Sequence, residues 1–315
     1  MTERQRNDEA NAKQPKPGSR LDAGVTKPEF GLEAVGVQAE PRVEASTTKP
    51  SQRLEAKVYI VGAGPGDPDL ITVKGLRIVE RADVVLYTDS LVSEDLVSHA
   101  GAHAEVLQSS GMDLEQMVDV MARTVSAGRS VARVHTGDPS VYGAILEQMV
   151  LLKQRDIPYE IVPGVSSVFA AAAALGAELT VPDLTQTVIL TRAEGRTPVP
   201  DREKLRDLAS HHCTVALFLS ATLAKKVVRE FLEAGWSEDT PVAVVQRATW
   251  PDQKIVRTTL RELDGALREA GIRMHAMILA GWALDPTLVD RDAHRSKLYD
   301  KTFTHGYRKG VAASE

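Results

Sequence analysis

The chain has 315 residues, of which 43% are hydrophobic, so it can bury enough core for two domains of ordinary size. Its formal net charge of −5 gives no reason to expect nucleic acid as a partner. A single cysteine, Cys213, excludes an internal disulfide, and neither a membrane-spanning apolar run nor a signal peptide is present, so we expect a cytoplasmic protein without a membrane partner.

Residues 1–55 are rich in Lys, Glu, Pro, Ser, Thr and Gly and have no sustained apolar period. Ordering such a segment costs conformational entropy that little burial offsets, so we expect a disordered N-terminal extension. We expect an α/β domain over residues 56–180 and a second α/β domain over 181–285. A polar tail is expected over 286–315.

The first of these domains alternates β-branched runs with helical patterns. Strands are expected at residues 57–61, 84–87, 131–134 and 159–162. Helices are expected after the first strand, over 112–126, from about 145, and up to about 175. Strands that alternate with helices predict a largely parallel sheet covered on both faces.

Residues 62–67, Gly-Ala-Gly-Pro-Gly-Asp, form a tight strand-to-helix turn in which glycines let a ligand approach the backbone. The turn fits a dinucleotide poorly, because Asp67 replaces the third glycine of that motif and Pro65 lacks an N–H for a pyrophosphate. The loop therefore suits a ligand with little negative charge or with a positive charge. A tight turn without a ligand is the alternative.

Two further loops, residues 136–141 and 163–167, also follow strands and precede helices. In a parallel sheet all three loops lie at the carboxyl edge, where ligands bind. The recurrence predicts one binding site at that edge. The alternative is that the three loops are well-formed strand-to-helix turns that bind no ligand. Asp67 and Asp138 are equally well placed to cap the helices that follow them.

In the second α/β domain the sequence pattern predicts strands at residues 186–191, 214–219, 241–246, 254–258 and 276–280. Its helices are expected at 201–209, 222–234 and 260–270. Neither a nucleophile elbow, nor a Walker loop, nor a zinc spacing occurs in the sequence, so no metal site is predicted.

The three loops together resemble the signatures of the tetrapyrrole methylases, in the order in which that family carries them. The resemblance covers residues 57–285 and implies two consecutive α/β domains with mainly parallel or mixed sheets and a cofactor cleft between them. It also implies a homodimer and the cofactor S-adenosyl-L-methionine, which becomes S-adenosyl-L-homocysteine. The cofactor contacts implied are Gly64, Pro65, Gly66, Thr136, Gly137, Asp138, Val141, Ser166, Ser167, Leu219 and Ala248.

Three stretches, residues 90–92, 135–145 and 187–200, resemble the branch of the family that methylates precorrin-4 or cobalt-precorrin-4 at carbon 11 to give precorrin-5. The alternatives are methylation of another position of a precorrin or of uroporphyrinogen III, an NAD-dependent oxidoreductase, and a tetrapyrrole-binding module. The carboxylates of the substrate make Arg192 and Arg196 candidate binding residues, because guanidinium binds carboxylate bidentately. The alternative is that these two arginines are surface residues that only keep the protein soluble.

Asp89 is the candidate catalytic residue. The match over Asp89, Leu91 and Val92 implies that Asp89 stands where relatives that methylate uroporphyrinogen carry a proposed proton-accepting aspartate. It follows the second predicted strand, so it is expected at the same carboxyl edge as the three loops. A solvent-exposed strand end is the alternative.

Overall fold

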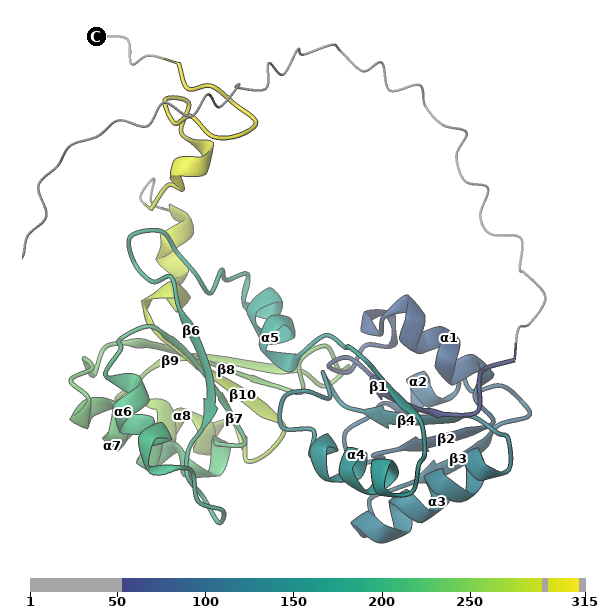
Figure 1. Ribbon diagram of the computed structural model, residues 1–315. Coiled ribbons are helices and arrows are strands. Elements are labelled where there is room, and N and C mark those ends of the chain that lie inside the picture. The colour runs from purple at the N-terminus through teal and green to yellow at the C-terminus, as the bar shows by residue number, and fades with distance from the viewer. Residues whose placement is uncertain (1–52, 291–293, 312–315) are drawn as a thin grey trace, which may run out of the picture. The chain divides into compact units, whose positions relative to one another are not determined.

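The computed structural model describes residues 53–290 and 294–311, drawn in colour in Figure 1. The N-terminal extension predicted for residues 1–55 therefore lies outside the described residues, apart from its last three. Within the described ranges, no helix is both long and apolar enough to cross a membrane.

The first sheet contains five strands, and every neighbouring pair is parallel. They are β1 (Val58–Gly62), β2 (Val84–Tyr87), β3 (Glu105–Gln108), β4 (Val131–His135) and β5 (Tyr159–Val162), in the order β3-β2-β4-β1-β5. The parallel sheet predicted from the alternation of strands and helices is thus confirmed. The edge strand β3 was not predicted, because it is short, polar at both ends and mostly exposed.

Helices cover both faces of this sheet. They are α1 (Val73–Arg81), α2 (Glu94–Val97), α3 (Leu114–Ser126) and α4 (Ile145–Gln154). Along β1, Tyr59 and Val61 join a buried cluster with residues of α1 and α2. Val58 and Ile60 join a second cluster with residues of α3 and α4. Since successive strand residues point to opposite faces, this division explains why β1 is apolar throughout.

The second sheet is mixed. Its strands are β6 (Val188–Arg192), β7 (Thr214–Phe218), β8 (Pro241–Gln246), β9 (Lys254–Thr259) and β10 (Ala276–Ala280), in the order β6-β7-β10-β8-β9. Only β6 and β7 pair in parallel, and the other pairs are antiparallel. All five predicted strands of this domain are confirmed.

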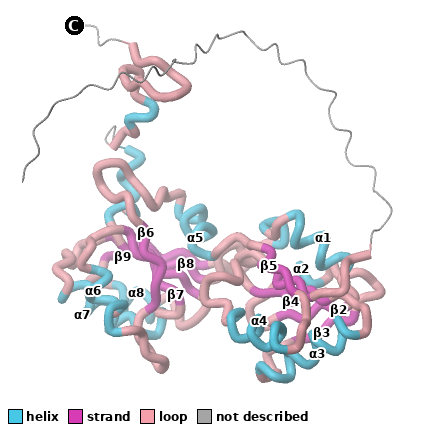
Figure 2. The backbone as a smooth tube through the Cα atoms, in the orientation of Figure 1, coloured by secondary structure: helices cyan, strands magenta, loops and turns pink. Residues whose placement is uncertain are grey.

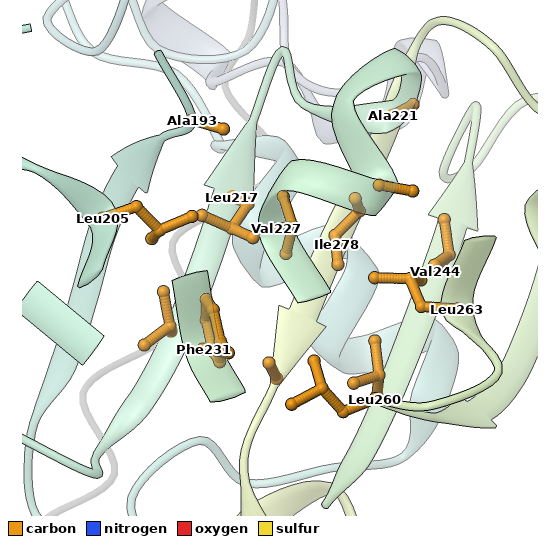
Figure 3. Close-up of a cluster of buried hydrophobic side chains, with 14 of the residues drawn as sticks. Ala193, Leu205, Leu217, Ala221, Val227, Phe231, Val244, Leu260, Leu263 and Ile278 are labelled. Atoms are coloured by element: carbon orange, nitrogen blue, oxygen red, sulfur yellow. The ribbon is translucent and has the colours of Figure 1, made fainter. Parts of the chain in front are cut away.

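One face of the second sheet packs against α6 (Leu205–Ala209), α7 (Ala224–Glu233) and α8 (Leu263–Glu269), as Figure 3 shows. Phe231, fully buried, lies in this cluster among Leu217, Val227 and Ile278. The predicted helix over 201–209 is interrupted at Lys204, whose extended backbone separates a 3₁₀ turn (Asp201–Glu203) from α6.

The opposite face packs against α5 (Ser167–Leu175), an alanine-rich helix that directly follows the strands of the first sheet. Its Val168 and Ala171 are buried in one cluster with Ala243 and Met277 of the second sheet. The boundary expected near residue 180 stays a prediction. Beyond β10 the chain forms 3₁₀ helices at Trp282–Leu284, Pro286–Asp290 and Lys297–Tyr299.

The loops that follow β1, β4 and β5, drawn in pink in Figure 2, pack backbone against backbone. The N–H of Gly137 donates to the carbonyl of Gly64 at 2.8 Å, and that of Ala63 donates to the carbonyl of His135 at 2.7 Å. A Cβ placed on Gly62 would lie 2.6 Å from Cα of Gly164 and 2.7 Å from the carbonyl oxygen of Gly137. The three loops approach this closely only because glycine has no side chain.

This packing predicts that Gly164→Ala destabilises the fold. The added methyl would overlap the carbonyl of Gly137, and overpacking of this kind typically costs about 1–3 kcal/mol of unfolding free energy. Urea denaturation measures the change. Gly265→Ala in α8 is the matched control, because nothing lies within 4 Å of its added Cβ, and it should raise stability by about 0.5–1 kcal/mol. Equal stability of the two variants would contradict the close packing of the loops.

Candidate functional site

A cavity of about 490 Å³ opens at the carboxyl edge of the first sheet. Its walls come from the loops after β1, β2, β4 and β5 and from the ends of β7, β8 and β10. It is lined by Pro65, Ser90, Leu91, Thr136, Gly137, Asp138, Val141, Tyr142, Ser166, Ser167, Phe218, Leu219, Ser220, Ala221, Thr222, Val245, Arg247, Ala248, Trp250, Arg273, Met274, His275, Ala276 and Met277. Its volume is in the range of small-molecule sites, about 300–1,000 Å³.

All the residues predicted to contact the cofactor line this cavity, except Gly64 and Gly66. They come from all three predicted loops and, through Leu219 and Ala248, from the second sheet. Residues more than 180 positions apart, such as Pro65 and Ala248, thus face one space. The three loops therefore line one cavity, and the contact of these residues with a cofactor stays a prediction.

Gly64 and Gly66 do not line the cavity. Gly64 has a φ of +80°, and a Cβ there would lie 2.9 Å from the carbonyl oxygen of Leu70. A Cβ on Gly66 would overlap the indole of Trp250. Both glycines are therefore required by the packing of the protein itself, and a contact of either with a cofactor stays a prediction.

Asp138 joins two of the loops. Its Oδ1 accepts the N–H of Ser140 at 2.8 Å, and its Oδ2 accepts the N–H of Gly164 at 2.9 Å. The capping alternative is wrong for Asp138, because the N-cap of α4 is Ala144, in the left-handed conformation. It is confirmed for Asp67, which accepts the N–H of Asp69 and caps the 3₁₀ turn Pro68–Leu70.

Several residues of the cavity wall carry backbone strain. Non-glycine residues with positive φ include Tyr142 (56°), Leu219 (52°), Arg247 (48°) and His275 (53°), all of which line the cavity. Such conformations cost of order 1–3 kcal/mol each and concentrate at ligand sites. At Leu219 the backbone holds a side chain that is 72% exposed, so its apolar surface is available to a ligand.

The charged groups of the wall differ in their partners. Nε of Arg247 lies 2.7 Å from a carboxylate oxygen of Asp252, whereas Arg273 has no ion pair within the described residues. The ring centroids of Tyr142 and Phe218, which both line the cavity, lie 5.0 Å apart, and burial raises the pKa of the Tyr142 phenol. The described ranges contain no group of three His, Cys, Asp or Glu residues placed to hold a metal ion.

Asp89 lies beside the cavity and does not line it, although its neighbours Ser90 and Leu91 do. Its carboxylate accepts the hydroxyl of Ser110 at 2.8 Å and the backbone N–H of Ser110 at 3.1 Å. These hydrogen bonds lower the pKa of Asp89, so the group is ionised at neutral pH. The structure thus places Asp89 at the expected edge of the sheet, and its catalytic role stays a prediction.

Arg192 and Arg196 do not line the cavity either. The guanidinium of Arg192 donates to the carbonyls of Thr197 at 3.2 Å and Pro198 at 2.8 Å, so it holds the loop after β6. Its charge also acts on Tyr142, a residue of the cavity wall, where it opposes the rise of the phenol pKa. Arg196 lies on the exposed part of that loop.

Trp250, Arg273 and the exposed Met274 also line the cavity and were not predicted from the sequence. Trp250 follows the predicted contact Ala248 by two residues, but nothing in the local pattern distinguishes it from a surface aromatic residue. Residues 273–275 form the turn before β10, and turns that precede strands are not expected at the ligand edge of a parallel sheet. They reach the cavity because β10 runs antiparallel to its neighbours.

The fold and the cavity define a two-domain α/β protein that binds a small molecule at the carboxyl edge of its parallel sheet. The chain belongs to the Tetrapyrrole (Corrin/Porphyrin) Methylases, whose family model matches residues 57–264. The resemblance inferred from the three loops is thereby confirmed.

Relatives of known activity match most of the chain. It is 70% identical over 255 residues to a cobalt-precorrin-4 C(11)-methyltransferase of Priestia megaterium, covering 81% of this chain and 98% of that protein. A solved cobalt-precorrin-4 methyltransferase superposes with a TM-score of 0.72 at 69% identity, covering 73% of this chain and 97% of the other. The uroporphyrin-III C-methyltransferase of Thermus thermophilus, solved with S-adenosyl homocysteine, gives a TM-score of 0.61 at 28% identity over 73% of this chain and 93% of its own.

Two basic residues of β4 are buried beside the site. Arg133 is 4% exposed and donates to Ser109 Oγ at 3.1 Å and to the carbonyl of Leu86 at 3.3 Å, and burial lowers its pKa to about 10. His135, 6% exposed, has no hydrogen-bond partner for Nε2 within the described residues. Burial, and secondarily the charge of Arg133, lower the pKa of His135 to about 3.

This burial predicts that His135 makes the fold sensitive to acid. Below pH 6.5 the unfolded chain protonates this imidazole, while the folded chain keeps it neutral down to about pH 3. The unfolding free energy should therefore fall as the pH falls, by up to about 1.4 kcal/mol per pH unit in that window. Urea denaturation at pH 7 and pH 5.5 should show a smaller difference for His135→Phe than for the wild type. His211→Phe, at an exposed histidine, should keep the wild-type difference, and an unchanged difference in His135→Phe would contradict the argument.

Proposed function

We propose that this chain is an S-adenosyl-L-methionine-dependent methyltransferase that methylates carbon 11 of precorrin-4 or cobalt-precorrin-4, giving precorrin-5 in cobalamin biosynthesis. The observation that carries the proposal is the single cavity formed by all three family loops together with Leu219 and Ala248. The 70% identical relative bears the name of this activity on the cobalt form of the substrate.

The wall of the cavity suits this cofactor. The sulfonium is cationic, and the residues that line the cavity include Asp138, which is anionic, and Thr136 and Ser166, which carry hydroxyls. Gly137 and Ala248 leave the main chain accessible, and Val141 and Leu219 offer apolar surface to an adenine ring. The relative solved with S-adenosyl homocysteine supports this choice of ligand.

The reaction requires alignment more than covalent catalysis. The electron-rich carbon 11 forms a bond to the methyl carbon, the bond between methyl and sulfur breaks, and sulfur keeps the electron pair as S-adenosyl-L-homocysteine forms. The chain holds the reacting carbon in line with that bond and excludes water, so proximity supplies much of the rate. Tyr142, Phe218 and Leu91 provide apolar surface for this exclusion.

Asp89, Arg192 at the end of β6 and Arg196 in the loop that follows act on the substrate. Methylation leaves the macrocycle more cationic, and the ionised Asp89 stabilises that charge or accepts the proton that is lost. Arg192, whose charge acts on the cavity residue Tyr142, and Arg196, on the exposed loop, pair with carboxylates of the substrate.

The chain acts in the cytoplasm as a homodimer. Large apolar side chains stay exposed on α4 and α5, including Leu146 (70%) and Phe169 (62%), and a second copy would cover such surface. Size-exclusion chromatography with light scattering tests the assembly. Membership of the methylase family favours methyl transfer over an NAD-dependent oxidoreductase and over a tetrapyrrole-binding module.

The proposed function is tested by supplying the purified chain with S-adenosyl-L-methionine and with precorrin-4 or cobalt-precorrin-4. We expect S-adenosyl-L-homocysteine and a tetrapyrrole heavier by one methyl group in the mass spectrum, with NMR placing the methyl on carbon 11. Comparing initial rates with the two substrates decides which form is natural. A methyl on another carbon would reassign the position, and the absence of S-adenosyl-L-homocysteine would refute methyl transfer.

Asp89→Asn keeps the shape of the side chain and removes its charge and basicity. If Asp89 acts in the chemical step, single-turnover methyl transfer should slow by roughly 100-fold or more, the usual scale for loss of a general base. Affinity for S-adenosyl-L-methionine, measured by calorimetry, should barely change, because Asp89 does not line the cavity.

The matched control for this variant is Asp156→Asn. Asp156 is exposed in the turn between α4 and β5, at the opposite edge of the parallel sheet, so this change should leave the rate unaltered. A wild-type single-turnover rate in Asp89→Asn would remove Asp89 from the mechanism. A loss of substrate affinity alone would make it a positioning residue.

A further inference from the structure

The hairpin of β8 and β9 contacts the glycine-rich loop after β1 through its tip, residues 247–253. The indole Nε1–H of Trp250 donates to the carbonyl of Pro65 at 2.9 Å. The backbone N–H of Asp67 donates to the hydroxyl of Thr249 at 3.0 Å. Two hydrogen bonds thus join the tip of this hairpin of the second sheet to the residues on either side of Gly66. The loop that contains Gly66 follows β1 of the first sheet.

The indole also fills the space that a side chain at position 66 would need. A Cβ on Gly66 would overlap Cδ1 and Nε1 of Trp250. Gly66 has no positive φ that would itself demand glycine, whereas Gly64 does. The glycine at position 66 is therefore explained by the tryptophan that packs against it.

Trp250 is held in turn by its own hairpin tip. The guanidinium carbon of Arg247 lies 4.1 Å from the centroid of the indole, and Arg247 is fixed by its ion pair with Asp252. Arg247 and Thr249 both have positive φ, which is unfavourable for a long side chain and more so for a β-branched one. The strained backbone of the hairpin tip therefore presents the indole and the Thr249 hydroxyl in a fixed geometry.

We propose that Trp250 is a positioning residue that holds the carbonyl and ring of Pro65 at the wall of the cofactor cavity. Pro65 and Trp250 both line that cavity, so a displaced indole would move the Pro65 surface that the cofactor meets. The inference rests on the proposed binding of S-adenosyl-L-methionine in this cavity. In this way the β8–β9 hairpin of the second sheet shapes the loop after β1 of the first sheet.

Trp250→Phe tests the hydrogen bond, because it removes the Nε1–H and keeps a ring beside Gly66 and Arg247. We expect Kd and KM for S-adenosyl-L-methionine to rise about 5- to 10-fold, the scale of one lost hydrogen bond, while KM for the tetrapyrrole stays within about twofold. Calorimetry and steady-state kinetics on the full chain measure these constants.

Trp236→Phe is the matched control. Its indole Nε1–H donates to the carbonyl of Ala209 at 2.6 Å in the core of the second sheet, away from the cavity. This variant should lower the melting temperature and leave the Kd for S-adenosyl-L-methionine unchanged. Unchanged Kd in Trp250→Phe as well would overturn the proposal.

A double-mutant cycle tests the packing of the indole on Gly66. Gly66→Ala should weaken cofactor binding and lower the melting temperature of the ligand-free chain, because the methyl displaces the indole. In a Trp250→Ala background the same change should have little further effect, since the space is then open. Additive effects in both measurements would overturn the proposal.

The two measurements separate this inference from the proposed function. A wild-type chain that shows the coupling in melting temperature but binds no S-adenosyl-L-methionine would refute the function and the cofactor role of Trp250 together. A wild-type chain that binds the cofactor and methylates the tetrapyrrole, with no coupling between positions 66 and 250, would refute the role of Trp250 alone.

Discussion

Backbone contact among the loops after β1, β4 and β5 is the constraint on which the site depends. Gly62, Gly137 and Gly164 meet with so little space that any Cβ on the first or the last would overlap main-chain atoms. Asp138 then ties its own loop to the N–H of Gly164. The loops therefore pack tightly together at the carboxyl edge of the parallel sheet. Thr136, Gly137 and Ser166, which belong to these loops, line the cavity.

The second sheet completes the cavity, and its mixed topology makes this possible. Since β10 runs antiparallel to β7 and β8, the turn before β10 lies at the same edge as the loops after those two strands. Arg273, Met274 and His275 thereby join Leu219 and Ala248 in one wall. A wholly parallel second sheet would have placed residues 273–275 at the far edge.

The chemistry of the wall agrees with a cationic cofactor and an anionic substrate. Asp138 lines the cavity with both carboxylate oxygens held by backbone N–H groups, so its negative charge is fixed in place. Asp89, beside the cavity, is kept ionised by Ser110. Arg192, the last residue of β6, holds the following loop through the carbonyls of Thr197 and Pro198, and its pairing with substrate carboxylates stays a prediction. The hydrogen bonds of Asp138 and Asp89 thus orient both carboxylates without a ligand.

The sequence by itself determined most of the strands and helices and the three glycine-containing loops, because these follow from local periodicity and from residues with special backbone freedom. It also determined the family and the part of the cavity wall that the three loops, Leu219 and Ala248 supply, since the motifs stand at the ends of recognisable strands. Only the tertiary structure decided that α5 covers the second sheet, that Asp138 bridges two loops, and that Trp250 explains Gly66. These features join residues 26 to 184 positions apart, and no local pattern of side chains encodes a contact of that range.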